Sequence, residues 1–263
     1  MISEKIIQNR ILNIKNTFLQ MYYKAKAGHL GSSLSCAEVL GVIWFHFKNH
    51  DDRVILSKGH AAAALYATLH EAGIVNADEI KTFYSNNTIL PAHPPVNKFD
   101  EIPFATGSLG HGLSIAAGLA YSNKIRNTKA KVFCVTSDGE LNEGSIWEAA
   151  LFISHHELNN LIWFIDRNRF QGFGGTEETI KLDPLDRKLE AFGFNVFQID
   201  GHSVPALMDL KMLFQKSAKP NVVIANTVKG NGWIGKSDTL ASHYLPMTEL
   251  EYNIFLNNLN NAS

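Results

Sequence analysis

The residues best suited to chemistry lie in the middle of the chain, around the stretch SDGELNEG at 137–144. Asp138 and Gly139 end a short apolar run there. Asn168 follows the next apolar run, roughly 30 residues further on, which is the length of one strand–helix–strand unit. In a parallel sheet both polar residues then emerge at the same edge, where ligands bind. A carboxylate and an amide oxygen suit Mg²⁺, and Gly139 allows a phosphate to approach a helix that starts near Glu143. The alternative is that both residues only end strands in turns.

Four of the eleven histidines lie in loops rich in glycine or small residues: His29 in AGHLGSS, His60 in SKGHAAA, His93 in PAHPP and His243 in SHYLP. Small neighbours beside an imidazole favour the approach of a ligand. An imidazole also titrates near neutrality, so it can donate or accept a proton at physiological pH. These four residues are therefore candidates for a binding or catalytic site.

A second phosphate-binding pattern occurs later in the sequence, where GNGWIGKS at 230–237 fits the loop that wraps nucleotide triphosphates. Such a loop needs a long helix directly after it, because the amides at the helix start must converge on the phosphates. The residues that follow, DTLASHYLPM, reach Pro246 and show no amphipathic face. A glycine-rich loop with Lys236 in solvent is the preferred interpretation, and a nucleotide-binding protein is the alternative.

Apolar runs and helical spacing alternate along the chain and predict the elements that position these residues. Short apolar runs typical of buried strands occupy 53–57, 131–138, 160–166, 194–200 and 221–228. Helical segments are predicted at 2–27, 59–73, 112–126, 144–157, 184–192 and 203–217, together with a helix that Ser35 caps and in which Glu38 completes a capping box. This alternation predicts an α/β fold with a mostly parallel central sheet and helices on both faces. No repeat or linker interrupts the pattern, so residues 1–263 are expected to form a single domain.

The composition is typical of a soluble globular protein, with 263 residues, 45% apolar residues and a net charge of -1. The balanced charge argues against a nucleic-acid partner, and no apolar run approaches the ~20 residues that span a bilayer. The charged N-terminal stretch differs from a signal peptide. Cys36 and Cys134 lie far apart in apolar surroundings, so we expect a reduced, cytoplasmic protein without a membrane partner.

Several segments, in order, resemble the N-terminal, thiamine diphosphate-binding domain of transketolases over nearly the whole chain. The similar segments are GHLGSSLSCAEVL, LSKGHAAAALYATLHEAG, PAHP, TGSLGHGLSIAAGLA, SDGELNEG followed by Asn168, IDGH, and TVKGNG running to SHY. Such an ordered set is far more specific than the single pattern at 230–237. The resemblance implies the thiamine diphosphate-binding fold, and phosphates that belong to this cofactor rather than to a nucleotide.

The resemblance also implies a role for each matched residue. Mg²⁺, or Ca²⁺, would be held by Asp138, Asn168 and the backbone carbonyl of Phe170. The cofactor would contact His60, Gly107, Ser108, Leu109, Gly139, Glu143, Asn168 and His243, with 107–109 lining the pocket for its ring. The sugar would meet three catalytic histidines, His29, His93 and His243. The chain departs from the family at Ser137, where a glycine is usual, and in SKGH, which replaces the more common SNGH and resembles the split-chain branch.

Complete transketolases are more than twice as long, so the resemblance implies the N-terminal subunit of a two-chain enzyme, with two copies of each chain. A C-terminal partner subunit would supply the Glu that activates the cofactor, facing Glu143, and most contacts to the sugar phosphate substrates. The reaction implied is transfer of a two-carbon ketol unit from a ketose to an aldose. The alternatives are a subunit of another thiamine diphosphate enzyme, such as a two-oxoacid dehydrogenase, and a scaffold protein that keeps the fold without turnover.

Overall fold

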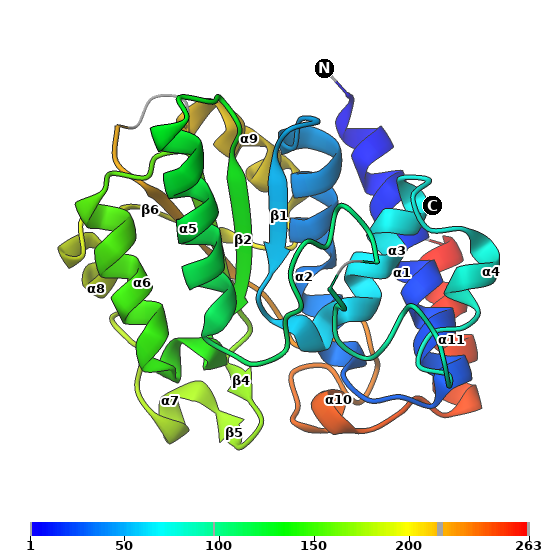
Figure 1. Ribbon diagram of the computed structural model, residues 1–263. Coiled ribbons are helices and arrows are strands. Elements are labelled where there is room, and N and C mark those ends of the chain that lie inside the picture. Colours follow the sequence, from blue (N-terminus) through cyan, green and yellow to red (C-terminus); the bar gives the residue numbers. More distant parts are fainter. Residues whose placement is uncertain (1, 97, 215–217, 262–263) are drawn as a thin grey trace.

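A five-stranded parallel sheet forms the centre of the protein in the computed structural model, which describes residues 2–96, 98–214 and 218–261 (Figure 1). The strands follow the order β1-β2-β3-β7-β6 across the sheet. Their bounds are β1 Arg53–Leu56, β2 Val132–Ser137, β3 Leu161–Arg167, β6 Asn195–Asp200 and β7 Asn221–Asn226. All five predicted strands are present, and every pairing between them is parallel. The predicted fold class is confirmed.

Helices cover both faces of this sheet, as predicted. The longer helices are α1 Glu4–Ala25, α2 Leu30–Val42, α3 Ala62–Glu71, α5 His111–Ile125, α6 Gly144–His155, α8 Leu185–Ala191, α9 Val204–Phe214 and α11 Glu249–Asn261. Short helical turns lie between them: η1 Ile43–Phe47, η2 Gly59–Ala61, α4 Ala77–Ile80, η3 Gly139–Asn142, α7 Thr176–Thr179 and α10 Ala241–Tyr244. A small antiparallel hairpin is formed by β4 Phe170–Gln171 and β5 Gly174–Gly175. The predicted helix at 203–217 is present over Val204–Phe214, and its last positions, 215–217, lie outside the described residues.

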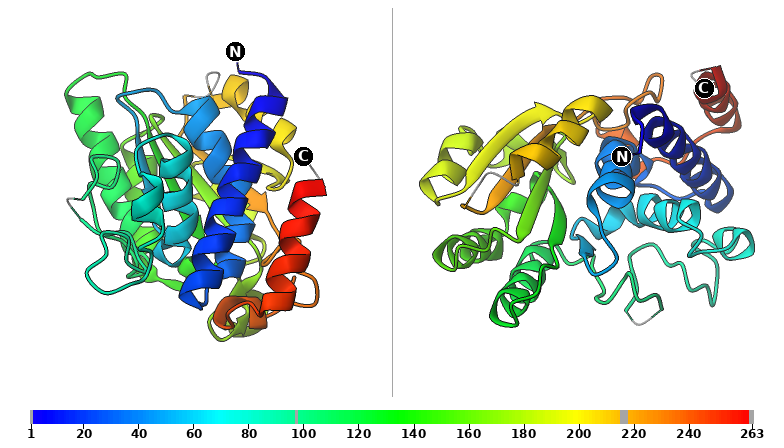
Figure 2. Two further views of the ribbon diagram at one scale, coloured as in Figure 1. Left: turned by 90° about the vertical axis from the view of Figure 1, so that its right-hand side faces the viewer. Right: turned by 90° about the horizontal axis from the view of Figure 1, so that it is seen from above.

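Two hydrophobic cores form because successive strand side chains point to opposite faces. On β2, Phe133 and Val135 belong to the core shared with α1, α2, α3, α9 and α11. Val132 and Cys134 belong to the core shared with α5, α6 and α8. Figure 2 shows α1 and α11 side by side on the outer side of the first core, where the rings of Tyr23 and Tyr252 stack 4.1 Å apart. The strands at the centre are therefore buried on both faces, as their continuous apolar runs indicated.

The predicted start of the second helix is wrong. Helix α2 begins at Leu30, and His29 is its N-cap with a left-handed φ of 72°. Ser35 lies inside the helix and donates its hydroxyl hydrogen to Asp166 Oδ2 over 2.6 Å, while Glu38 pairs with Lys15 rather than closing a capping box. The whole helix is buried, so its polar side chains serve tertiary contacts that spacing alone does not reveal.

The helical stretch Leu30–Phe47, formed by α2 and η1, is 18 residues long and apolar, although no apolar run of nearly membrane-spanning length was expected. By length and composition it could cross a membrane. However, 89% of it is buried inside the fold, as is usual for the central helix of a globular core.

Candidate functional site

The predicted site residues converge at the carboxyl edge of the sheet. Lys58 and His60 follow β1, Asp138 follows β2, and Asn168 follows β3. The neighbouring strands β2 and β3 are in register, with Ser137 paired to Asp166, so the residues that follow them emerge together. Figure 1 shows the β4–β5 hairpin and α10 at this same edge. Ligands bind at this edge in open α/β sheets.

Three of the four loop histidines form a tight cluster. The ring centroids of His29 and His243 lie 4.8 Å apart, those of His29 and His60 lie 5.7 Å apart, and those of His60 and His243 lie 5.8 Å apart. His93 lines the same cavity. The histidines that were selected from their loop context are therefore brought together by the fold.

The close contact between two distant segments explains the cluster. The backbone N–H of His29 donates to the carbonyl of His243 over 2.8 Å. Gly28 and Gly31 flank this contact. A Cβ on Gly28 would lie 2.7 Å from Tyr244 O, and a Cβ on Gly31 would lie 2.5 Å from Ser242 Oγ. Only glycine allows so close an approach, which accounts for the small residues around His29.

A cavity of about 330 Å³ opens at the cluster. Of the predicted site residues it is lined by His29, His60, His93, Gly107, Leu109, Gly139, Glu143, Phe170 and His243. Ser108 is exposed and lies outside this lining, while Asp138 and Asn168 are buried just behind it. Sequence reasoning missed several lining residues: Ser137, Asn142, Gln171, Gly172, Phe173 and Lys229. Larger cavities lie along α1 and α4, away from the histidine cluster.

Asp138 and Asn168 are held by the backbone around them. Asp138 Oδ1 accepts the N–H of Gly139 over 2.8 Å, and its Oδ2 accepts the N–H of Arg169 over 2.6 Å. Asn168 Oδ1 accepts the N–H of Phe170 over 3.1 Å. Burial, together with the neighbouring carboxylate of Asp166, raises the pKa of Asp138 to about 6. Among the described residues, no group of three or more His, Cys, Asp or Glu side chains is arranged to hold a metal ion.

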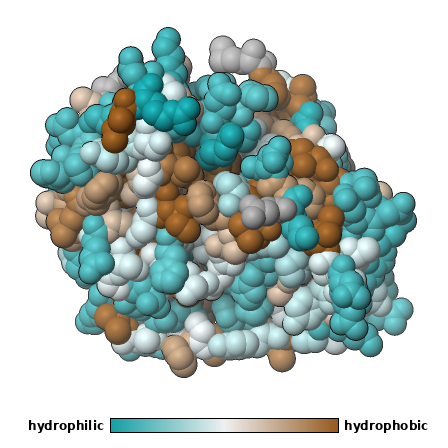
Figure 3. Space-filling model, viewed as in Figure 1, coloured by the Kyte–Doolittle hydropathy of each residue, from teal (hydrophilic) through white to brown (hydrophobic). Residues whose placement is uncertain are grey.

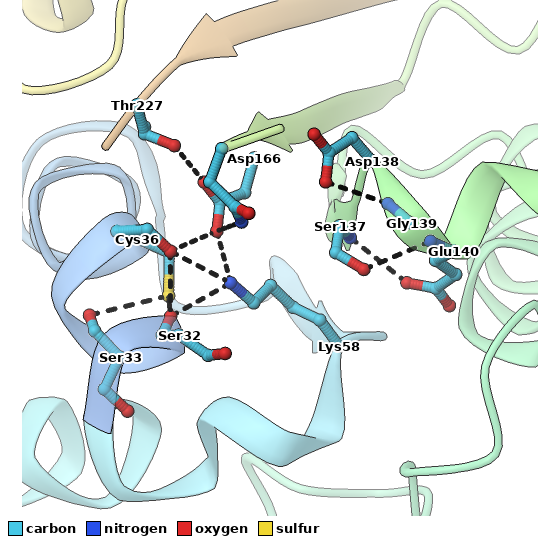
Figure 4. A network of polar contacts seen from close by, with 12 residues as sticks. Ser32, Ser33, Cys36, Lys58, Ser137, Asp138, Gly139, Glu140, Asp166 and Thr227 are labelled. Atoms are coloured by element: carbon cyan, nitrogen blue, oxygen red, sulfur yellow. Dashed lines mark hydrogen bonds and ion pairs between the residues drawn. The ribbon is translucent and has the colours of Figure 1, made fainter. Parts of the chain in front are cut away.

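A buried ion pair lies next to Asn168, and Figure 4 shows its two members, Lys58 and Asp166. The Lys58 ammonium and the Asp166 carboxylate form this pair, and both side chains are fully buried. Asp166 also accepts hydrogen bonds from Ser35, Thr227 and the Asn168 amide. Burial opposes the charged form of each partner, but the mutual attraction is larger, so the pKa of Lys58 is raised and that of Asp166 is lowered. Because the Asn168 Nδ2 donates to Asp166 over 3.3 Å, its amide oxygen faces the opposite way, toward the loop that carries Phe170.

Glu140 joins three loops on the other side of Asp138 (Figure 4). Its carboxylate accepts the hydroxyl hydrogen of Ser57, the N–H of Gly110 over 2.8 Å and the N–H of Ser137 over 3.2 Å. Burial raises the pKa of this carboxyl group, although these three donors oppose the shift. The contact with Gly110 ties the loop at 107–110 to the turn that begins at Asp138.

Lys229 supplies an unpaired cation to the cavity. Its side chain is 1% exposed, and no carboxylate in the described part of the chain forms an ion pair with it. Burial and the neighbouring Lys58 ammonium lower the pKa of Lys229 to about 8. Lys58 and Lys229 lie in the segments LSKGH and TVKGNG, where a lysine beside a glycine at the end of a strand is a signal that could have identified both.

The clustered histidines are neutral at pH 7. Burial, with help from His93 and Lys229, lowers the pKa of His29 to about 4, and burial and Lys229 lower that of His243 to about 3. Burial and Lys58 lower the pKa of His60, and burial lowers that of His93. A neutral imidazole offers one donor and one acceptor. In the described part of the chain, the buried His243 Nδ1 has no hydrogen-bond partner. The cavity can therefore bind an anion through Lys229 and hydrogen-bond hydroxyl groups through its imidazoles.

The glycine-rich stretch at 230–237 is not a triphosphate-binding loop. It forms successive turns after β7, and the next helix is the four-residue α10. The expected glycine-rich loop is confirmed. Lys236 is absent from the cavity lining, as expected, but its Nζ lies 3.6 Å from Glu251 Oε1, so the expectation of a lysine in solvent is wrong. Without a long helix the backbone amides cannot converge on a triphosphate.

Exposed aromatic and apolar side chains lie beside the cavity. Phe173, at the turn of the β4–β5 hairpin, is 90% exposed. Tyr244 is half exposed and donates its hydroxyl hydrogen to Gly172 O over 2.6 Å, which joins α10 to the hairpin. On the face drawn in Figure 3, apolar side chains lie in separate groups among polar ones.

Comparison with known proteins agrees with this geometry. The family model described as "Transketolase, thiamine diphosphate binding domain" matches residues 6–259. The chain is 42% identical over 214 residues to one subunit of the apulose-4-phosphate transketolase of Actinobacillus succinogenes, covering 78% of each chain. It is 36% identical over 253 residues to the 6-deoxy-6-sulfo-D-fructose transketolase subunit SqwG of Clostridium sp., covering 92% of each chain.

Longer transketolases are similar over part of their length. Human transketolase is 38% identical over 240 residues, which are 87% of this chain and 38% of the human protein. The crystal structure of transketolase from Campylobacter jejuni matches with a TM-score of 0.92 at 29% identity, covering 98% of this chain and 43% of that chain. These relatives favour the transketolase prediction over the two-oxoacid dehydrogenase alternative. The resemblance that the sequence motifs indicated is thus confirmed, and the chain belongs to the transketolase family, over its thiamine diphosphate-binding domain.

Proposed function

We propose that this chain is the thiamine diphosphate-binding subunit of a two-chain transketolase, which transfers a two-carbon ketol unit from a ketose to an aldose. One observation carries the proposal: a relative named as a transketolase subunit matches this chain over 92% of both lengths. The histidine-lined cavity with its unpaired lysine supports the same conclusion from the chemistry of the site.

The residues at the cavity fit a diphosphate. Lys229 brings a buried positive charge that Asp138 and Asp166 attract from a distance but that forms no direct ion pair among the described residues. A buried charge without a direct partner is costly until a counter-ion binds. His243 has a buried Nδ1 without a partner, and His60 lies within the same cluster. Gly139 begins the short helix η3 at the cavity wall and packs tightly on Gln171, since a Cβ at this position would lie 2.7 Å from Gln171 Cβ. Gly107, Ser108 and Leu109 would line the part of the site that holds the ring of the cofactor.

The metal that neutralises the diphosphate would be Mg²⁺ or Ca²⁺. Asp138, Asn168 and the carbonyl of Phe170 are the oxygen donors proposed for it. Each side-chain oxygen of Asp138, and Oδ1 of Asn168, accepts a single backbone N–H, which leaves a further lone pair for a cation. The raised pKa of Asp138 supports this assignment, because a buried carboxylate gains from an adjacent cation.

When bound, thiamine diphosphate supplies a nucleophilic thiazolium carbon and an electron sink for the two-carbon fragment. The chain contributes the environment around the reacting sugar. His29, His93 and His243 are neutral, so each can donate one hydrogen bond to a sugar oxygen and accept one from a hydroxyl group. Such groups can orient the ketose and move a proton at its carbonyl and hydroxyl oxygens. His29 and His243 are half-buried, whereas His93 is exposed at the mouth of the cavity.

A separate partner subunit would complete the site, with two copies of each chain in the assembly. Several relatives are named as a single subunit of a transketolase, which implies a second subunit in those enzymes. Glu143 is exposed at the cavity lining and caps α6, so it can meet a carboxyl group of the partner. Phe173, 90% exposed beside the cavity, is the side chain best placed to pack against that partner.

The donor proposed for this enzyme is a ketose with an anionic group at the end remote from the ketol unit. Two relatives are named for apulose-4-phosphate and for 6-deoxy-6-sulfo-D-fructose, and both names include a group that is anionic at neutral pH. The proposal therefore includes sugar phosphates and sugar sulfonates, and the substrate panel of the assay separates them.

A coupled assay of aldose release tests the function. The chain, the partner subunit and their mixture are each supplied with Mg²⁺, thiamine diphosphate, a ketose phosphate or ketose sulfonate, and an aldose acceptor. We expect turnover only in the mixture, because the activating Glu comes from the partner, and such general acid–base help is worth about 10² to 10⁴-fold. Full activity of this chain alone would refute the two-chain assignment, and no activity with any ketose in the mixture would refute transketolase function.

A further inference from the structure

The turn Asp200–Gly201–His202, between β6 and α9, has no part in the chemistry proposed above, yet it is packed against the end of β7. The Gly201 N–H donates to Asn226 O over 2.8 Å. A Cβ on Gly201 would lie 2.5 Å from Thr227 Cγ2, so the turn requires glycine there. Asp200 Oδ1 accepts the His202 N–H over 2.9 Å, which sets the direction of the His202 side chain.

The contacts of His202 determine which of its ring nitrogens carries the proton. The backbone N–H of Val228 donates to His202 Nε2 over 2.9 Å. Because a backbone N–H can only donate, Nε2 must hold a lone pair, and the proton is on Nδ1. Nδ1 lies 3.2 Å from Glu38 Oε2 and donates to it. The other oxygen of Glu38 accepts from Lys15 over 2.5 Å, which holds the carboxylate in place. The imidazole is therefore held by Glu38 at Nδ1 and by the Val228 N–H at Nε2.

The Val228 contact restrains the backbone of the lysine that follows. On the far side of Lys229, the Gly230 N–H donates to Gly31 O over 3.1 Å. The peptide group directly after Lys229 is thus held at both ends, because its carbonyl also accepts the Asp238 N–H over 2.7 Å. Before Lys229, His202 holds the Val228 N–H, which belongs to the peptide group between Thr227 and Val228. Val228 itself is 36% exposed, so without His202 its N–H would turn to water.

We propose that His202 is a positioning residue that, through the Val228 N–H, fixes Lys229 for binding the diphosphate; this rests on the proposed function. The contrasting role is structural only, in which His202 stabilises the fold through Glu38. The two roles use different ring nitrogens, so single substitutions separate them.

Two substitutions of His202 by an amide side chain, Asn or Gln, each keep one of its two ring contacts. His202→Asn has an amide near the position of Nδ1, so it keeps a donor for Glu38 and loses the acceptor for Val228. His202→Gln reaches the position of Nε2 with an amide oxygen, so it keeps the acceptor and loses the contact to Glu38. The affinity of the full chain for thiamine diphosphate with Mg²⁺ is measured by calorimetry for both variants, together with deuterium exchange of the Val228 amide and the thermal midpoint.

We expect His202→Asn to weaken cofactor binding about threefold to tenfold, the usual worth of one hydrogen bond, and to speed exchange at Val228. His202→Gln should stay within about twofold of the unsubstituted chain in affinity. A cycle with Lys229→Met shows whether His202 acts through Lys229. In the Lys229→Met background, His202→Asn should cost no further affinity.

The proposal is overturned if His202→Asn speeds exchange at Val228 but leaves affinity unchanged, or if its cost persists in the Lys229→Met background. Equal losses of affinity and thermal stability in both variants would indicate the structural role instead. If the unsubstituted chain binds no thiamine diphosphate, the proposed function fails, and exchange of the Val228 amide in the two variants still decides whether His202 holds this backbone.

Discussion

The N–H of His29 donates to the carbonyl of His243 over 2.8 Å, and the rings of the two residues lie 4.8 Å apart although they come from opposite ends of the chain. His29 caps α2, the central buried helix, while His243 lies in the short helix α10 after the last strand. This contact forms part of the cavity wall and leaves both imidazoles half-buried. Their protonation is consequently coupled to folding.

The first prediction concerns this coupling. The pKa of His29 in the fold is about 4, below its ordinary value of about 6.5, so the unfolded chain binds this proton more readily between these pH values. The free energy of unfolding should therefore fall as the pH drops from about 6.5 toward 4, by up to about 1 kcal/mol per pH unit from His29 after allowance for solvent. His29→Asn, which tolerates the left-handed φ of this position, should have a shallower dependence.

Urea unfolding at pH 7.5, 6.5, 5.5 and 4.5 checks this prediction. The difference at pH 7.5 reports any change in packing, because both side chains are then neutral. Identical slopes for the two proteins below pH 6.5 would contradict a neutral, buried His29.

The second prediction separates two lysines. Lys229→Met should weaken thiamine diphosphate binding about tenfold to a hundredfold, because a charge-assisted hydrogen bond contributes about 1.5–3 kcal/mol. The free energy of unfolding of Lys229→Met should not fall, because the buried ammonium that it removes has no described ion-pair partner. Lys236→Met is the matched control, because Lys236 pairs with Glu251 outside the cavity. Calorimetric titration measures both; a larger loss in Lys236→Met would reverse the assignment of the phosphate site.

The third prediction tests the metal. Asp138→Asn should weaken Mg²⁺-dependent binding of thiamine diphosphate at least about tenfold. The free energy of unfolding at pH 7 should fall by about 1–3 kcal/mol, because the amide oxygen can accept only one of the two N–H groups, of Gly139 and Arg169, that the carboxylate accepts. Removal of a buried carboxylate with a raised pKa offsets part of this loss. Titration with Mg²⁺ and with EDTA measures the effect. Equal affinities of variant and unsubstituted chain in Mg²⁺ would remove Asp138 from the metal site.

The fourth prediction concerns assembly. Phe173→Ser should weaken association with the partner subunit by roughly tenfold, because aromatic side chains dominate interfaces, while the free energy of unfolding changes by less than about 0.5 kcal/mol. Met212→Ser is the control, because this side chain is 60% exposed and belongs to α9. Figure 1 shows α9 at the opposite end of the fold from the β4–β5 hairpin. Surface-binding measurements compare the affinity of the partner subunit for Phe173→Ser and for Met212→Ser. Unchanged association in Phe173→Ser would place the docking surface elsewhere.

Periodicity was sufficient for the central sheet and for the helices between its strands, whereas α11 and the β4–β5 hairpin were not predicted. All five strands and the helices between them follow from apolar runs and helical spacing, because a buried strand and an amphipathic helix each leave a local pattern. The four histidines were also identified from local context, since a loop imidazole beside small residues needs no knowledge of its partners. The start of α2 was predicted wrongly because Ser35 and Glu38 have the local form of a cap but bond to distant residues.

Local sequence patterns could not determine which residues far apart in the sequence contact each other. Lys58 and Asp166 are separated by much of the chain and meet only because β1 and β3 flank β2 in one parallel sheet. The charge of Lys229 matters because tertiary burial removes water and leaves it without a described carboxylate partner, which its neighbours in sequence do not reveal. The tautomer of His202 depends on a backbone amide of another strand end. Side-chain identity is encoded locally, whereas burial, pairing and pKa arise from packing between segments, and only the folded chain decides them.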